Sequence, residues 1–312
     1  MTGRICRYKN GARSAFTFVF DDGCYKESTL DVYKIFKGIY EETGIKFKAT
    51  SAQTVDFINE DLKKMWQGLL DEGYFDLASH SITHCITYNS TTPVDKLEYD
   101  ARETKARLEA MYKGHRSLVH ATPGGGSDEI GCQVLKKYYI ANRNGKDGIN
   151  IPDKIDWYDV GTFTAMLKRG SEEYIDNINK TIENGGWSVQ INHWITKKTE
   201  DIFHSQSYYT FVDQCNYLKE KALDSEIWVT GFSDASLYLQ EAERSTLEIT
   251  EAADKVLVSL KCPLESEVYN YPLTVEIDTL LPLKNEKGDT LTPVNGQIRI
   301  SVAPNATVTL WK

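Results

Sequence analysis

The 312-residue chain is predicted to be an α/β protein, with a closed or nearly closed barrel of parallel strands and a small all-β domain after it. Through about residue 240, apolar strand-like runs alternate with amphipathic stretches, as in parallel sheets with helical crossovers. From about residue 245, short alternating strands follow one another with no helix between them. We therefore expect a barrel domain in residues 1–244 and a β-sandwich-like accessory domain in residues 245–312.

The barrel strands are expected where apolar, Phe- and Val-rich runs occur. These runs cover residues 15–20, 45–50, 74–79, 117–121, 138–142, 158–164, 187–192 and 227–232. Helices are expected where apolar residues recur at helical spacing, as Leu30, Val32 and Phe36 do. These stretches cover residues 28–42, 92–112, 171–184, 208–221 and 233–244. Pro93 favours the start of the second helix, and Gly185 the end of the third.

The accessory domain is expected to contain short strands separated by turns such as Asn295-Gly296. The strands cover residues 246–250, 256–260, 273–277, 298–302 and 307–311. A unit of about 65 residues is small for independent stability, so we expect it to brace the barrel. Its few aromatic residues form no obvious row for stacking on sugars.

Charge and composition exclude several classes of protein. The net charge of −9 argues against a nucleic-acid partner, which requires a basic face. No run approaches the roughly 20 apolar residues of a transmembrane helix. The first residues lack the apolar centre of a signal peptide, which fits a cytoplasmic protein or one whose leader was removed. Of these, we favour an extracytoplasmic protein, secreted or periplasmic.

Two adjacent aspartates, Asp21 and Asp22, end the apolar run at 15–20. Ionised carboxylates side by side repel each other, so a buried pair needs a cation, a proton or a hydrogen-bond donor. The pair therefore predicts a metal site or an acid/base site at the end of this strand.

Two histidines, His80 and His84, follow the strand expected at 74–79. At this spacing they would share one face of a helical turn and could converge on one ion, although the spacing alone also fits two surface or capping histidines. In a parallel barrel all strands open toward the active site at their carboxyl ends, so Asp22, His80 and His84 could meet there. One carboxylate and two imidazoles leave positions for water and substrate, which indicates a catalytic metal site, with zinc as the first candidate.

Three further segments contain candidate site residues. The glycines at 124–126 follow the strand at 117–121 and form either a plain turn or a backbone N–H site for an oxyanion. The segment 155–159 contains Asp156 and Trp157, which on their own fit a loop with a packed tryptophan. His193 follows the strand at 187–192, where a neutral-pH acid/base would be a histidine.

Taken in order, these segments resemble the motifs of the polysaccharide deacetylase family, also called the chitooligosaccharide deacetylase homology domain. The resemblance covers roughly residues 10–240. Its matching segments are Phe18-Val-Phe-Asp-Asp-Gly23, with Thr17 displaced upstream, His80-Ser-Ile-Thr-His84, Ala121-Thr-Pro-Gly-Gly125, Asp156-Trp157 and Ile191-Asn-His193. The first two motifs are specific and the last three are weaker. The resemblance implies a distorted (β/α)7 barrel.

The resemblance also implies a role for each matching residue. Asp21 would be the general base, and His193 would be the general acid, supported by Asp156. Asp22, His80 and His84 would bind the metal. Trp157 would line the substrate groove, and the N–H of Gly124 would bind the oxyanion. The family has an arginine that holds the catalytic aspartate, and Ala121 occupies its position here. Arg116 or Arg143 could replace it from another position.

The function implied by the resemblance is metal-dependent removal of N-acetyl groups from an amino-sugar oligo- or polysaccharide. It requires one divalent metal ion, first of all zinc, with cobalt and nickel as alternatives, and a carbohydrate substrate. Three other functions fit the same residues: an esterase for O-acetylated xylan or another glycan, a hydrolase of small amides, and a glycan-binding protein with a vestigial site.

Overall fold

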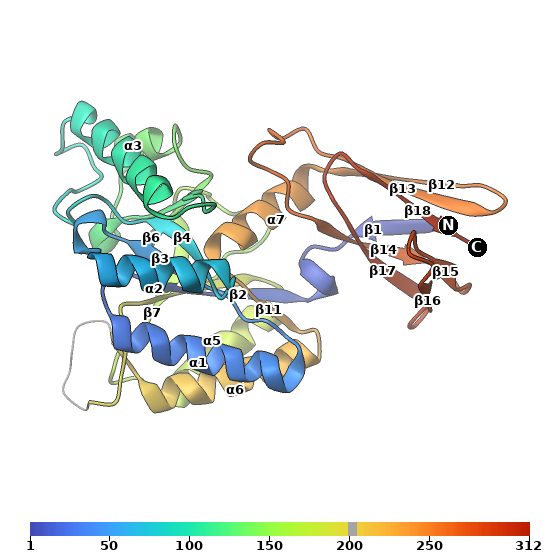
Figure 1. Ribbon diagram of the computed structural model, residues 1–312, viewed down its shortest axis with the longest axis horizontal. Helices are drawn as coiled ribbons and strands as arrows, with labels where there is room; N and C mark the ends of the chain where they lie inside the picture. The colour runs from blue at the N-terminus through green and yellow to red at the C-terminus, as the bar shows by residue number, and fades with distance from the viewer. Residues whose placement is uncertain (199–204) are drawn as a thin grey trace. The chain divides into compact units, whose positions relative to one another are not determined.

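The computed structural model describes residues 1–198 and 205–312 (Figure 1). The chain forms two compact units, one of residues 14–235 and the other of residues 1–13 together with 236–312. The first thirteen residues, which we assigned to the barrel domain, therefore group with the C-terminal residues. Among the described residues, no helix has both the length and the apolar character needed to cross a bilayer.

Residues 14–235 contain a closed parallel barrel, as the sequence predicts. Within the described residues its seven strands follow the order β2-β3-β4-β5-β6-β7-β8, and β8 pairs with β2 to close it. The strands are β2 (Ser14–Phe20), β3 (Ala49–Gln53), β4 (Phe75–Ser79), β5 (Val119–Ala121), β6 (Ala141–Asp147), β7 (Val160–Thr164) and β8 (Trp187–Asn192).

The barrel is distorted at one edge of β2. The first half of β2 pairs with β11 (Ile227–Val229), whereas only Val19 and Phe20 at its end pair with β3. Two of the expected strands also begin later than predicted, since β3 starts at Ala49 and β6 at Ala141. Both β3 and β6 therefore include polar residues that follow the predicted apolar run.

Seven helices occur in the described part of the chain. They are α1 (Lys26–Thr43), α2 (Glu60–Asp71), α3 (Val94–Met111), α4 (Glu129–Leu135), α5 (Ser171–Glu183), α6 (Tyr208–Leu223) and α7 (Phe232–Arg244). Helices α1, α5 and α6 lie side by side (Figure 1). The sequence analysis missed α2 and α4. The sequence did contain a signal for α2, since asparagine is a favoured N-cap residue. In the structure, the side chain of Asn59 accepts hydrogen bonds from the N–H groups of Asp61 and Leu62.

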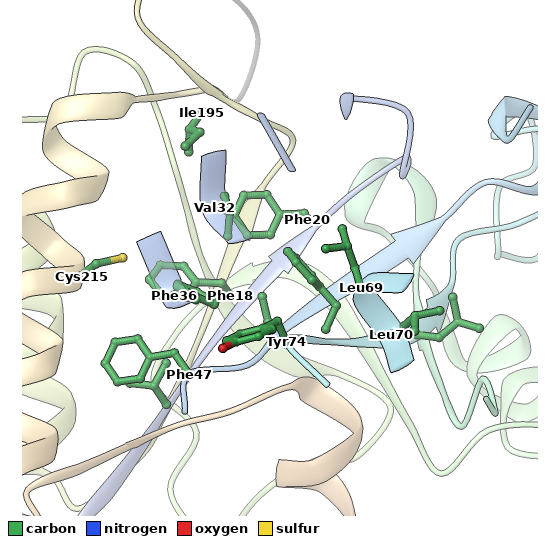
Figure 2. Close-up of a cluster of buried hydrophobic side chains, with 14 of the residues drawn as sticks. Phe18, Phe20, Val32, Phe36, Phe47, Leu69, Leu70, Tyr74, Ile195 and Cys215 are labelled. Carbon is green, nitrogen blue, oxygen red and sulfur yellow. The ribbon is translucent and has the colours of Figure 1, made fainter. Parts of the chain in front are cut away.

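One core cluster packs β2, β3 and β4 against α1, α2 and α6. Phe16, Phe18 and Phe20 alternate along β2, and Phe18 contacts Phe36 of α1 and Phe211 of α6 at ring-centroid distances of 6.0 and 5.1 Å. Figure 2 shows Phe18, Phe36 and Phe47 within this cluster. Burying each such side chain stabilises the fold by about 1.5–3 kcal/mol. The apolar run that ends in Asp21 is therefore firmly anchored.

Residues 1–13 and 236–312 contain two antiparallel sheets, with strand orders β1-β14-β17 and β12-β13-β18-β15-β16. The strands are β1 (Thr2–Ile5), β12 (Thr246–Glu251), β13 (Lys255–Lys261), β14 (Leu273–Asp278), β15 (Leu283–Lys284), β16 (Thr290–Leu291), β17 (Gln297–Val302) and β18 (Thr307–Trp311). The sheets contact each other where β1 meets β12 and where β13 meets β17. The sequence analysis missed β1 because it has only four residues, none of them buried.

Candidate active site

Three of the predicted site residues come together at the carboxyl end of the barrel. Asp22 follows β2, and His80 and His84 follow β4. One ligand atom from each residue lies within 4.8 Å of the other two. Both Nε2 of His80 and Nε2 of His84 lie near Oδ1 of Asp22, at 3.8 and 3.7 Å. These separations are too long for hydrogen bonds.

This cluster fits a metal ion. Two ligand atoms that each lie about 2.0–2.2 Å from the same zinc ion are at most about 4.4 Å apart. The distances from Oδ1 of Asp22 to Nε2 of His80 and to Nε2 of His84 are both below this limit. Oδ1 of Asp22 and Nε2 of His80 are buried and have no hydrogen-bond partner among the described residues. Buried polar atoms are rarely left without a partner, so a cation between them accounts for both.

The ring of His80 is oriented by the backbone of β5. Its Nδ1 lies 2.7 Å from the carbonyl oxygen of Ala121, which can only accept, so Nδ1 carries the proton and Nε2 presents a lone pair. Burial, the largest influence, and the nearby Arg143 lower the pKa of His80 to about 4, against the opposing effect of the carboxylates. His80 is therefore neutral near pH 7, the state in which imidazole binds metals.

The turn that joins the two histidines is irregular, and the expected helical turn is wrong. Ser81 and His84 have φ values of +69° and +64°, and Asp22 has +70°. This left-handed region costs a residue with a side chain about 1–2 kcal/mol. The N–H of His84 donates to Oγ of Ser81 (2.9 Å), and the N–H of Ile82 donates to Oδ2 of Asp100 (3.1 Å). Strained residues of this kind concentrate at functional sites.

The second aspartate, Asp21, is paired with Arg143 of β6. Its Oδ1 accepts a hydrogen bond from the guanidinium group, and both side chains are buried. Burial alone would raise the pKa of Asp21, but Arg143, His80 and His193 together outweigh it and lower the pKa. Of the two arginines considered as replacements for the family arginine, the structure brings Arg143 to Asp21.

His193 lies at the same end of the barrel, directly after β8. Phe20 and Asn192 are register partners in the β2–β8 pairing, so Asp21 and His193 follow adjacent strands at the same level. The backbone N–H of Asp21 donates to the carbonyl oxygen of Asn192 (2.8 Å), and His193 contributes to the lowered pKa of Asp21. The predicted base and acid therefore belong to one site.

Two aromatic residues beside this site were missed in the sequence. The hydroxyl of Tyr25 donates to Oδ2 of Asp22 (3.1 Å), and the Tyr25 ring lies 4.3 Å from the ring of Trp194. Burial and the charge of Asp22 raise the pKa of Tyr25, so the hydroxyl keeps its proton and remains a donor. The only sequence signal was position, since Tyr25 closely follows Asp22 and Trp194 follows His193.

Gly124 lies after β5, also at the carboxyl end of the barrel. It is exposed and has a φ of +67°, within a short turn that covers Pro123–Gly125. This is the expected end of the barrel for an oxyanion site. The role of its N–H group stays a prediction.

Asp156 and Trp157 are not brought to this site. They precede β7, and the carbonyl oxygen of Trp157 accepts from the N–H of Asn142 (2.7 Å) near the start of β6. The Trp157 ring lies 6.3 Å from that of Trp187, the first residue of β8. Both residues are therefore at the amino ends of the strands, opposite to Asp21 and His193. From there Asp156 cannot support His193, and Trp157 cannot line a groove beside it.

The solved structures that resemble this chain include several deacetylases. A putative polysaccharide deacetylase from Mycobacterium smegmatis shares 13% identity with a TM-score of 0.51, covering 81% of this chain and 99% of that one. The barrel has the fold of the polysaccharide deacetylases. No family model and no curated protein matches the sequence.

Two further polysaccharide deacetylase-like structures resemble it more weakly. A family 4 carbohydrate esterase from Bacillus anthracis has 14% identity and a TM-score of 0.46, covering 71% of this chain and 82% of that one. A polysaccharide deacetylase from Bacillus cereus has 19% identity and a TM-score of 0.41, covering 63% of this chain. The match spans about half of that protein's length (50%).

Proposed function

We propose that this protein is a metal-dependent deacetylase of the polysaccharide deacetylase family, which hydrolyses N-acetyl groups of an acetylated amino-sugar glycan. The observation that carries the proposal is the buried cluster of Asp22, His80 and His84 beside a second carboxylate, Asp21, that Arg143 holds in place. The shared fold supports it. A polysaccharide substrate also favours a location outside the cytoplasm.

Asp22, His80 and His84 would hold one divalent metal ion. One carboxylate and two imidazoles suit zinc, and cobalt or nickel would also be accepted. When bound, such an ion polarises a carbonyl group and lowers the pKa of water. Because the protein provides three ligands, the coordination shell keeps room for substrate.

Asp21 would be the general base. Its lowered pKa keeps it ionised near neutral pH, so it can accept a proton from the attacking water. The hydrogen bond from Arg143 fixes one of its oxygens and leaves the other, Oδ2, on the side of His80, whose Nε2 lies 3.9 Å away. The carboxylate is thereby aimed at the metal cluster.

His193 would be the general acid. Water adds to the acetyl carbon, the carbon–nitrogen bond breaks, and the sugar nitrogen leaves with a proton from His193 while acetate is released. The N–H of Gly124 would donate to the carbonyl oxygen as negative charge develops on it.

An acetate-release screen tests this proposal. The substrates would be an N-acetylated glucosamine oligomer, acetylated xylan and a panel of small amides including cyclic ones, each with and without chelator. We expect release from the oligomer that chelator abolishes, and in Asp21→Asn a loss of roughly 100-fold or more with metal binding retained. His115, on the surface and paired with Asp71 at 2.8 Å, provides the control His115→Ala.

Each other outcome contradicts a specific part of the proposal. Unchanged release by Asp21→Asn would exclude Asp21 as the base. Release from acetylated xylan alone would make the protein an O-acetyl esterase, and cleavage of the small amides alone would make it a small-amide hydrolase. Glycan binding without release, even with added zinc, cobalt or nickel, would indicate a vestigial site.

A further inference from the structure

Four amide side chains form a fully buried cluster between β8 and α6. Two come from β8, one from α6 and one from β10 (Gln206–Ser207), and they are Gln190, Asn192, Gln214 and Gln206. Gln190 is the register partner of Phe18, which packs against α1 and α6, so Gln190 and Asn192 face the same helices. Burying an amide is costly unless it is hydrogen-bonded. Four amides in this otherwise apolar layer therefore indicate that specific hydrogen bonds are needed there.

Gln206 lies at the centre of the cluster. Its Oε1 accepts from Nε2 of Gln190 and from Nδ2 of Asn192, at 2.9 Å each. Its Nε2 donates to Oε1 of Gln214 (2.9 Å), and Nε2 of Gln214 donates to Oε1 of Gln190 (2.7 Å). The three glutamines thus form a closed ring of hydrogen bonds, and Asn192 is joined to it through Gln206. A buried network in which every member is paired is rigid.

The same glutamine holds the residues on both sides of His193. Its side chain accepts from the side chain of Asn192, and its backbone N–H donates to the carbonyl oxygen of Trp194 (3.0 Å). The pairing continues in β9 (Ile195–Thr196), where Ile195 is the register partner of Gln206. With both of its chain neighbours held, the backbone of His193 has little freedom to shift.

Asn192 also connects this arrangement to the proposed base. Its carbonyl oxygen accepts from the backbone N–H of Asp21 (2.8 Å), while its side chain donates to Gln206. A displacement of Asn192 would therefore change the separation between Asp21 and His193. Misplacing a reacting group by about 1 Å can lower a rate by about 100-fold, so the position of this strand end matters for catalysis.

We propose that Gln206 is a positioning residue for His193, which it holds through the residues on either side. The inference rests on the proposed function, because it assigns a role within that same site. Within the described residues, the side-chain hydrogen bonds of Gln214 go to Gln190 and Gln206, not to a neighbour of His193. Gln214 therefore provides a matched control from the same cluster.

The test compares Gln206→Met with Gln214→Met. Methionine is unbranched and of similar length, and each variant removes three side-chain hydrogen bonds of the cluster. Their losses of stability in thermal unfolding should therefore be similar. Asn192→Ala removes the bond to Gln206 from the other side and should reproduce the effects of Gln206→Met, which guards against a folding defect in that variant.

The kinetic effect should depend on the leaving group. In metal-loaded Gln206→Met, kcat for the N-acetylated glucosamine oligomer should fall by roughly tenfold or more, with KM near that of the wild-type protein. The loss should be smaller for p-nitrophenyl acetate, whose leaving group needs no proton. Gln214→Met should change both rates little.

A conservative variant should restore the lost function. Gln206→Glu keeps an oxygen that accepts from Asn192, and burial favours the protonated carboxyl group, which can also donate to Gln214. This variant should recover most of the kcat that Gln206→Met loses.

Hydrogen exchange tests the contact without any substrate. The N–H of Ile195 donates to Oγ of Ser28 (2.7 Å), and both residues are buried. If Gln206 holds this segment, the N–H of Ile195 should exchange several-fold faster in Gln206→Met than in Gln214→Met, as measured by NMR.

Equal exchange at Ile195 in Gln206→Met and Gln214→Met would overturn the inference. Equal losses on the oligomer and the ester in Gln206→Met would also overturn it, as would the absence of any recovery in Gln206→Glu. If the wild-type protein releases no acetate from any substrate, the proposed function fails, and the exchange comparison alone decides whether Gln206 holds the segment around His193.

Discussion

Arg143 of β6 donates a hydrogen bond to Asp21, the residue that follows β2, inside the barrel. Arg143 is also the register partner of Ala121 in the β5–β6 pairing. Ala121 occupies the position at which the resembling family has its arginine, so the positive charge reaches the same carboxylate from the neighbouring strand. Arg143 therefore supplies a positive charge to Asp21 from the strand next to the one in which the resemblance places the arginine.

The first prediction concerns Arg143→Met and the pH dependence of acetate release. Arg143 lowers the pKa of Asp21, and burial raises it, so removing the guanidinium should raise this pKa. A general base must be deprotonated, and the acid limb of the kcat/KM profile should therefore move to higher pH. The profile would be measured beside Arg102→Met, which removes an exposed arginine. An acid limb that does not move would contradict the role of the pair.

The second prediction concerns His84→Ala and metal affinity. The His84 side chain is 34% exposed, so its removal should leave the fold intact. It should remove one of the three proposed ligands and weaken zinc binding on the order of 100-fold or more, as followed by calorimetry. His115→Ala serves as the matched control. Equal zinc affinity in His84→Ala and the wild-type protein would place the metal elsewhere.

The third prediction concerns Asp100, which positions the turn between His80 and His84. Its Oδ2 accepts from the N–H of Ile82 and its Oδ1 from the hydroxyl of Tyr88 (2.7 Å). Asp100→Ala should release the turn and weaken metal binding by about 10–100-fold. Tyr88→Phe leaves the bond to Ile82 in place and should have a smaller effect. If both variants weaken zinc binding equally, the contact with Ile82 is not the important one.

The fourth prediction concerns His193→Gln. Loss of the proposed general acid should lower kcat for the amide substrate by about 10²–10⁴-fold, while zinc affinity stays near that of the wild-type protein. An activated ester with a good leaving group needs less protonation, so its hydrolysis should fall less. Equal losses on the amide and the ester would argue against a proton-donating role.

The sequence predicted the barrel, and the proximity of Asp22, His80 and His84 within it, for one physical reason. Parallel strands open toward one end, so residues that follow strands, such as Asp22 after β2 and His80 after β4, lie at the same end of the barrel and can meet there. The strands themselves were visible because apolar runs such as 15–20 are buried against helices. The order of these segments in the chain was enough, without knowledge of the strand register.

The features that the sequence could not predict depend on strand register or on contacts within short segments. Choosing Arg143 over Arg116 required the pairing of Ala121 with Arg143, which only the sheet provides. Asp156 and Trp157 matched a motif but precede β7, so they lie at the other end of the barrel. Trp194 and Tyr25 could not be predicted as neighbours, because a single contact between two aromatic rings produces no periodic pattern in the sequence.

The most direct test of the central claim is a metal titration of acetate release. Protein stripped with chelator would be titrated with zinc while release from the N-acetylated oligomer and zinc binding are followed together. We predict no release from the stripped protein, and a rise that ends at one zinc ion per chain and is absent in Asp22→Asn. Release that persists without metal, or that rises equally in Asp22→Asn, would contradict the claim that Asp22, His80 and His84 form the catalytic metal site.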